Sequence, residues 1–287
     1  MTDTNSRDTE TADTPTASAP VPALEFINVS CRFEIDEKGN GYTATQGVSF
    51  TIADGEFVSV VGPTGCGKST ILNMAAGLLT PSEGSIRIFG KPVNGIDPRV
   101  GYMFQADSLM PWATALDNVT AGLRFRGTPI EEANRLGMEW LARVGLDRFP
   151  DRYPHELSGG MRKRVAMAQT LINDPELILM DESFSALDVQ TRQLMENELL
   201  EIWSAKKRAV LFITHDLEEA ISMSDRVLVL SAGPASHPIA DFRITLDRPR
   251  NVADIRSTPA FHRIYSDIWS VLREEVMKSY EKSRSAI

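Results

Sequence analysis

The sequence predicts an α/β fold built around a mainly parallel β-sheet. Four short apolar runs have the length of buried strands, at residues 57–61, 177–180, 210–213 and 227–230. The first run leads directly into a glycine-rich loop, and a helix is expected from Lys68. A second helix is expected over residues 189–206, between the second and third runs. Strands that alternate with helices in this way are typical of a parallel sheet with helices packed against it.

Composition excludes several classes of protein. The chain has 287 residues, of which 42% are hydrophobic and 24% are charged, and this is ordinary globular composition. A net charge of -9 argues against a nucleic-acid-binding protein, which usually carries a basic face. The two cysteines, Cys31 and Cys66, lack metal-ligand spacing, and no apolar run approaches the roughly 18 residues of a membrane span. Any membrane role is therefore expected to come through a partner.

The remaining segments suggest three regions. Residues 1–23 are rich in Thr, Ser, Pro and acidic residues, and we expect a disordered tail there. A main domain is predicted over residues 24–255, beginning with alternating strands at 24–29 and 48–52. It contains a helical insert over about 106–172, with helical patterns at 115–144 and 158–172 and a break at 127–129. A C-terminal helical extension is predicted over 256–287, with one packed stripe formed by Phe261, Ile264, Ile268, Leu272 and Val276.

The glycine-rich loop has the pattern of a phosphate-binding loop, G-x-x-x-x-G-K-[ST]. It reads Gly62-Pro63-Thr64-Gly65-Cys66-Gly67-Lys68-Ser69 and is followed by Thr70. Glycines allow successive backbone N–H groups to face one centre, where the helix N-terminus also attracts phosphate. We expect Lys68 to neutralise the outer phosphates and Ser69 to bind Mg²⁺. The loop predicts a ligand with several phosphate groups, bound together with Mg²⁺.

Two carboxylates follow the second apolar run, at Asp181 and Glu182. Ligands of α/β sheets lie at the carboxyl ends of the strands. We expect Asp181 to belong to the Mg²⁺ site and Glu182 to accept a proton from an attacking water. Such a pair alone is more typical of a solvated turn, and it is the phosphate-binding loop that favours the catalytic interpretation.

A third motif, Leu157-Ser158-Gly159-Gly160, precedes the acidic pair at the start of a predicted helix. In isolation it would indicate a Ser N-cap followed by two glycines. In this order and spacing, the chain resembles the ABC ATPases over about residues 24–280. Further segments resemble family motifs in the expected order, namely Phe33 (the residue that stacks on adenine), Gln105 (the Q-loop), Ser185-Ala186-Leu187-Asp188 (the D-loop) and Thr214-His215-Asp216 (the switch histidine).

The resemblance implies a P-loop NTPase fold with a RecA-like parallel core, an antiparallel β subdomain and a helical signature subdomain. It implies catalytic roles for Glu182, His215 and Gln105, with Gln105 also close to Mg²⁺. Ser158, Gly159, Gly160 and Asp188 would complete the ATP site of a second ATPase subunit, and the pair is expected to be a homodimer. Closure of that dimer would drive integral-membrane permease subunits at the cytoplasmic face of the inner membrane.

A finer resemblance indicates the nitrate/sulfonate/taurine group of importers, which also use an external solute-binding protein. It is carried by Leu109-Met110-Pro111-Trp112, by Met161 after the signature, and by the segments 244–250 and 268–276. The chain departs from the commoner family pattern at Gln169-Thr170-Leu171 and at Ser183, neither of which removes a catalytic group.

Two other functions are compatible with parts of the pattern. A soluble ABC ATPase of assembly or repair usually carries long coiled-coil or zinc insertions, or two cassettes, and this chain has neither. A nucleotide-dependent binding module without hydrolysis would lack catalytic groups, whereas Glu182 and His215 are both present. The sequence therefore favours the transporter ATPase.

Overall fold

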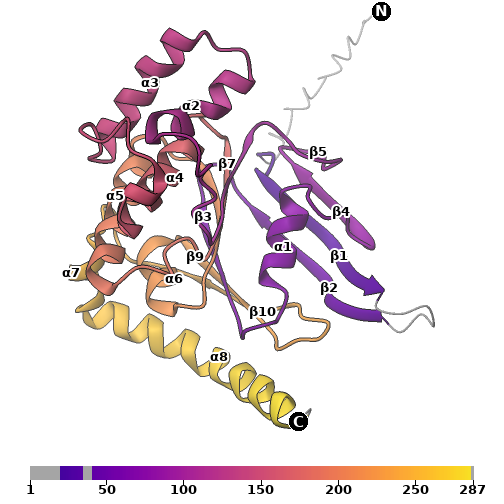
Figure 1. Ribbon diagram of the computed structural model, residues 1–287. Coiled ribbons are helices and arrows are strands. Elements are labelled where there is room, and N and C mark those ends of the chain that lie inside the picture. Colours follow the sequence, from indigo (N-terminus) through magenta and orange to yellow (C-terminus); the bar gives the residue numbers. More distant parts are fainter. Residues whose placement is uncertain (1–19, 35–40, 286–287) are drawn as a thin grey trace, which may run out of the picture.

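The computed structural model describes residues 20–34 and 41–285, which form two β-sheets with helices around them (Figure 1). The disordered tail predicted for residues 1–23 lies outside the described residues as far as residue 19. Ala23, the last residue of that segment, is fully buried, and its N–H donates to the carbonyl of Ile52 at 2.8 Å. The packed part of the chain therefore includes Ala23.

The larger sheet has six strands in the order β10-β9-β3-β8-β7-β6. Its strands are β3 (Phe57–Val61), β6 (Val100–Met103), β7 (Leu177–Asp181), β8 (Ala209–Ile213), β9 (Arg226–Leu230) and β10 (Pro238–Arg243). All neighbouring pairs are parallel except β10 with β9. The four apolar runs are β3, β7, β8 and β9, so the predicted parallel core is confirmed. In β3 every residue is buried, as expected for a strand covered on both faces.

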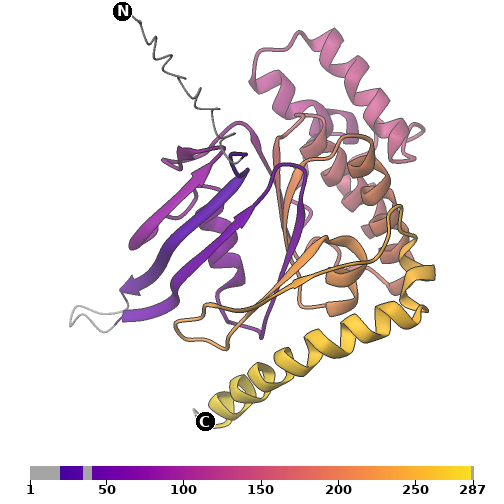
Figure 2. The same cartoon turned by 180° about the vertical axis from the view of Figure 1, so that it is seen from behind.

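The smaller sheet is antiparallel, with the order β2-β1-β4-β5. Its strands are β1 (Leu24–Glu34), β2 (Gly41–Ile52), β4 (Glu83–Ile88) and β5 (Lys91–Pro92). Helix α1 (Lys68–Ala75) lies between the two sheets (Figures 1 and 2). Ile71 of α1 belongs to one buried cluster with Phe26 of the smaller sheet and Leu211 of the larger sheet. This shared core holds the smaller sheet against the phosphate-binding loop.

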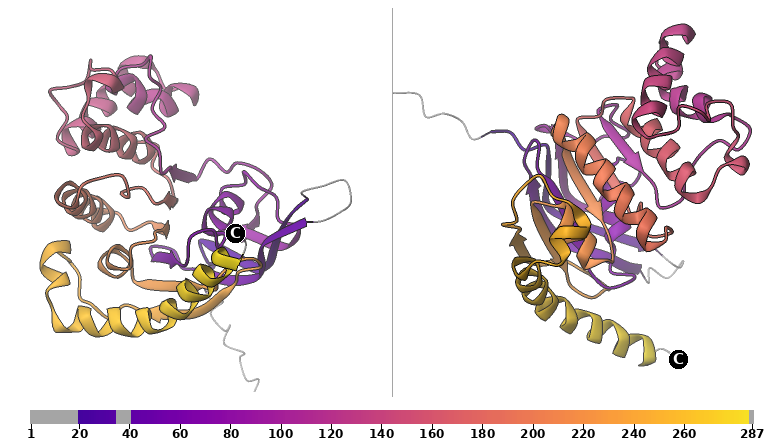
Figure 3. Two further views of the ribbon diagram at one scale, coloured as in Figure 1. Left: turned by 60° about the horizontal axis from the view of Figure 1, so that its bottom comes forward. Right: turned by 90° about the vertical axis from the view of Figure 1, so that its left-hand side faces the viewer.

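The helical insert projects from the sheets (Figure 3). It contains α2 (Ala115–Phe125), α3 (Ile130–Arg143), a 3₁₀ turn (Pro154–Glu156) and α4 (Gly159–Leu171), and α5 (Val189–Ala205) follows β7. The predicted break at 127–129 is confirmed, with Gly127 at a φ of 85°. Val119, Leu141 and Val165 join the insert to the larger sheet through one buried cluster that includes Met180.

The C-terminal part consists of α6 (Leu217–Met223), α7 (Val252–Arg256) and α8 (Pro259–Ser285). Phe261, Ile268 and Leu272 of α8 are buried against α6 and β9. The predicted packed stripe does not extend to Val276, which is 36% exposed, while the neighbouring Glu275 is buried. The reason is that Glu275 accepts a hydrogen bond from the N–H of Ala232, beyond the end of β9. Within the described part of the chain, no helix has the length and apolarity needed to cross a membrane.

Candidate functional site

The phosphate-binding loop connects β3 to α1 at the carboxyl edge of the larger sheet. Gly65 and Gly67 adopt positive φ angles of 77° and 91°. A Cβ on Gly67 would lie 2.9 Å from Cγ2 of Thr45 and 3.1 Å from the carbonyl of Ala44. Backbone conformation and close approach to β2 therefore both require glycine at position 67.

Lys68 is buried, and its ammonium donates to the carbonyls of Gly62 at 2.9 Å and Pro63 at 3.0 Å. A phosphate group in the loop would compete for the same donor. The Cys66 side chain is also buried, and burial raises the pKa of its thiol, although the positive charge of Lys68 opposes this. Gly62 and Pro63 therefore act through their backbone carbonyls, and the side chain of Cys66 is packed inside the loop.

Asp181 ends β7 beside the start of α1. The Ser69 hydroxyl donates to Oδ1 of Asp181 at 3.2 Å, and the Tyr102 hydroxyl lies 3.5 Å from Oδ2. Burial raises the pKa of Asp181, and the charge of Glu182 adds to this effect. A cation next to Asp181 would favour its ionised form. The hydroxyl and carboxylate oxygens together are the hard ligands that Mg²⁺ prefers.

Glu182 lies next to the other two predicted catalytic residues. Its Oε2 is 3.0 Å from Nδ1 of His215 and accepts from Nε2 of Gln105 at 3.4 Å. The backbone of Glu182 has a φ of 42°, which is uncommon for a residue with a side chain, and its N–H donates to the carbonyl of Ile213 at 2.8 Å. Gln105 thus contacts Glu182, while Ser69 and Asp181 contact each other.

Glu182, His215 and Gln105 line one cleft of about 570 Å³ together with Lys68 and Ser69, and Asp181 reaches it through its contact with Ser69. Phe33 lies at its edge, 40% exposed and paired across the small sheet with Tyr42. The sequence interpretation missed Tyr42 and Ala44, which reach the cleft because β2 pairs with β1, with Tyr42 opposite Phe33. The cleft is lined by Phe33, Tyr42, Ala44, Thr64, Gly65, Gly67, Lys68, Ser69, Thr70, Gln105, Glu182 and His215.

The signature and D-loop residues lie elsewhere. Ser158 is the N-cap of α4 and accepts from the N–H of Met161 at 3.3 Å, while Asp188 is the N-cap of α5 and accepts from the N–H of Thr191 at 3.0 Å. The two segments are neighbours, because a Cβ on Gly160 would lie 3.0 Å from Cγ2 of Thr191. The cleft next to the phosphate-binding loop, called the phosphate cleft below, is not lined by Ser158, Gly159, Gly160 or Asp188.

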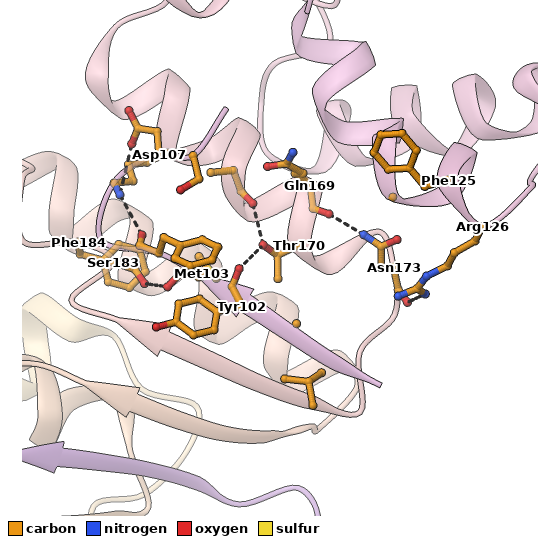
Figure 4. A pocket seen from close by; sticks show the side chains of 17 residues that line it. Tyr102, Met103, Asp107, Phe125, Arg126, Gln169, Thr170, Asn173, Ser183 and Phe184 are labelled. Carbon is orange, nitrogen blue, oxygen red and sulfur yellow. Dashed lines mark hydrogen bonds and ion pairs between the residues drawn. The ribbon is translucent and has the colours of Figure 1, made fainter. Parts of the chain in front are cut away.

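A second cavity of about 450 Å³ lies between β6 and the helices α2 and α4 (Figure 4). Thr170 donates to the carbonyl of Tyr102 at 3.4 Å, and the Ser183 hydroxyl donates to the carbonyl of Met103 at 3.2 Å. Ser183, a departure from the family pattern, therefore has a defined partner. Phe125 lines the outer part of this cavity and is 84% exposed. Phe104, next to Gln105, also lines this cavity, which therefore lies between the Q-loop and the helical insert.

A parallel sheet whose first buried strand leads into a phosphate-binding loop, with paired carboxylates after a second strand, defines a P-loop ATPase. Comparisons with known proteins specify the class further. The sequence profile described as ABC transporter matches residues 45–185. The chain belongs to the ABC transporter family, as an ATP-binding cassette with ATPase activity.

Several relatives cover nearly the whole chain. An uncharacterised ABC transporter ATP-binding protein of Methanocaldococcus jannaschii is 44% identical over 89% of this chain and 93% of its own length. A taurine import ATP-binding protein of Rhizobium johnstonii is 41% identical over 86% and 94%. A dimeric ATP-binding cassette solved in a post-hydrolysis state with ADP and Pi superposes with a TM-score of 0.69. It is 31% identical and covers 78% of this chain and 100% of that one.

Proposed function

We propose that this chain is the ATPase subunit of an importer for taurine or a related small solute, such as another sulfonate or nitrate. The observation that carries the proposal is the similarity to taurine import ATP-binding proteins along nearly the whole chain, from Rhizobium johnstonii at 41% and Pelagibacter ubique at 39% identity. The chain would act at the cytoplasmic face of the inner membrane, with permease subunits and an external solute-binding protein as partners.

The proposed catalytic step is attack of water on the γ-phosphate of ATP, which breaks the bond to the bridging oxygen and releases ADP and inorganic phosphate. Glu182 accepts the water proton, and its contacts with His215 and Gln105 hold the carboxylate in the cleft. Lys68 and the amides of the loop stabilise charge on the phosphates. Phe33 offers an exposed ring for the adenine. Positioning and charge stabilisation would provide most of the rate enhancement.

The chemistry of two groups supports a Mg²⁺ site. The Ser69 hydroxyl and the Asp181 carboxylate are in contact, and we assign both to the bound ion, with Gln105 nearby. The ion would neutralise phosphate charge when ATP is bound.

The separation of the signature from the phosphate cleft supports a dimer. Ser158, Gly159, Gly160 and Asp188 form one neighbourhood outside the cleft of their own chain. In the proposed homodimer, each of these surfaces covers the cleft of the other subunit and contributes to ATP binding. ATP would close the pair and hydrolysis would release it, which is a ligand-biased two-state switch.

The second cavity and its surroundings support a permease contact. Trp112 and Phe125 are 76% and 84% exposed on the helical insert, and Phe125 lines the cavity that adjoins the Q-loop. Large exposed apolar side chains commonly mark interaction surfaces. A permease segment at this place would contact Phe104, next to Gln105, and the signature helix together.

Hydrolysis by the purified chain and by Glu182→Gln tests the proposal, together with the oligomeric state of each form with and without ATP. We expect cooperative hydrolysis by the parent chain, and an ATP-stabilised dimer of the variant with turnover reduced about 10²-fold or more. Normal hydrolysis by the variant, with no dimer in either form, would contradict both the assigned base and the composite site. Membrane fractionation with a co-expressed permease tests the partner.

A further inference from the structure

We propose that the C-terminal helix α8 is a positioning element of the nucleotide site, and that Glu275 is the residue through which it acts. The helix would hold the segment 231–237, which in turn holds the phosphate-binding loop against strand β2. This inference rests on the proposed function only in taking the cleft as the nucleotide site.

The first contact is between α8 and the segment that follows β9. Glu275 is 6% exposed, and its Oε2 accepts from the N–H of Ala232 at 2.6 Å. Its Oε1 accepts from Lys278 at 2.5 Å. About two turns after Glu275, the ammonium of Lys282 donates to the carbonyl of Gly233 at 2.9 Å. Two side chains of α8 therefore fix two consecutive residues of the segment.

The second contact is between the same segment and the phosphate-binding loop. The buried Ser236 hydroxyl donates to the carbonyl of Cys66. Gly233 is so close to the loop that a Cβ on it would lie 3.1 Å from the carbonyl of Gly65. The segment therefore contacts the outer side of the loop at two of its residues.

The third contact links the segment to β2. The N–H groups of Ala235 and Ser236 donate to the carbonyls of Thr43 at 2.7 Å and Ala44 at 3.1 Å, and the N–H of Gln46 donates to the carbonyl of Ser236 at 3.0 Å. Ala44 lines the cleft and limits the space around Gly67. The segment thus connects β2 with the phosphate-binding loop, which both line the cleft. Helix α8 holds this segment in position.

Removal of the Glu275 carboxylate would leave the buried N–H of Ala232 without its acceptor, which is costly, so the segment would shift. The phosphate-binding amides would lose their alignment, while Glu182, Gln105 and His215, on other elements, would keep theirs. We therefore expect weaker nucleotide binding with little change in turnover at saturation.

The test measures the Kd for a fluorescent ADP analogue, and the KM and kcat for ATP, on the full chain. Glu275→Ala should raise Kd and KM about tenfold and change kcat less than about twofold. Glu275→Gln keeps an acceptor oxygen and should recover most of the affinity. Glu274→Ala, one residue away on the exposed side of α8, is the matched control and should match the parent.

Lys282→Met, at an exposed position, tests the same link if Glu275→Ala does not fold, and should weaken binding about two- to threefold. An unchanged Kd in both Glu275→Ala and Lys282→Met would overturn the inference, as would an equal loss in Glu274→Ala. Because the ADP titration involves no hydrolysis or transport, the inference can fail while the proposed function stands, and the reverse is also true.

Discussion

The buried ammonium of Lys163 donates to the backbone carbonyl of Gln105 at 2.5 Å, and so connects the signature helix to the Q-loop. Lys163 lies on α4, five residues after Ser158, and is 5% exposed. Its ammonium also lies 3.3 Å from Asp107. The hydrogen bond from the buried Lys163 therefore ties the helical insert to the residue that contacts Glu182.

Lys163→Met should lower the kcat for ATP about tenfold while the affinity for ADP stays near that of the parent. The reason is that Gln105 loses its backbone support, whereas the phosphate-binding loop is untouched. Steady-state hydrolysis and nucleotide titration measure the two effects separately. Arg162→Gln is the control, because Arg162 also contacts Asp107, at 2.9 Å, but has no contact with Gln105. An equal loss of kcat in both variants would assign the effect to Asp107.

Gly67→Ala should abolish nucleotide binding. The added Cβ would meet both Thr45 and Ala44, at a φ of 91° that disfavours a side chain. Gly127→Ala is a matched control, because its φ is 85° and a Cβ there meets nothing within 4 Å. Gly127→Ala should lose about 1 kcal/mol of stability from its φ alone, and Gly67→Ala should lose more because of the two close contacts. Only Gly67→Ala should lose binding. Thermal unfolding and titration with the ADP analogue separate the two effects.

Phe33→Ala should weaken binding of ATP and GTP about tenfold each, because stacking on an aromatic ring tolerates any base. Competition titrations with both nucleotides measure the change. Phe125→Ala removes a still more exposed ring outside this cleft and should leave both affinities unchanged. A loss confined to ATP would indicate hydrogen-bond readout of adenine in place of stacking.

The fully buried Glu196 should make stability depend on pH. Burial raises the pKa of Glu196 from its ordinary 4.5 to about 8, against the attraction of Arg256 at 3.1 Å. The folded state thus favours the protonated form, so this contribution is complete below about pH 4.5 and is lost as the pH rises through about 8. Each unit of pKa difference corresponds to about 1.4 kcal/mol.

Glu196→Gln should therefore flatten the fall in unfolding free energy between pH 5 and pH 8, which denaturant titrations at several pH values would measure. Glu201→Gln, exposed on the same helix α5, controls for the loss of one acidic residue. A fall of the same size in Glu196→Gln and the parent would show that other groups cause it.

Sequence reasoning predicted the parts of the fold that depend on the pattern of neighbouring residues in the chain. The strands β3, β7, β8 and β9 are continuous apolar runs, and the helix breaks follow Gly and Pro. Strand β10 was missed because its residues alternate between half-buried and exposed, and it begins with a proline. The predicted apolar stripe on α8 was wrong at Val276. The hydrogen bond between Glu275 and the N–H of Ala232 decides which face of the helix is buried there.

The residues of the candidate site also fall into those that a local pattern predicts and those that it does not. Asp181 ends a buried strand, and Glu182 and His215 follow buried strands by one and two residues, so their position at one edge of the sheet could be predicted. The contact of Lys163 with Gln105 spans 58 residues, and that of Ser236 with Cys66 spans 170. No local pattern marks such pairs, because each depends on how whole elements pack.

The burial of Cys66 has a consequence for redox chemistry. Thiolates are the reactive form of cysteine, and a thiol whose pKa is raised by burial forms little of it. Mild oxidants and alkylating reagents should therefore react with this loop slowly, and only when it opens. The rate at which Cys66 is labelled would then report how often the phosphate-binding loop exposes the Cys66 side chain.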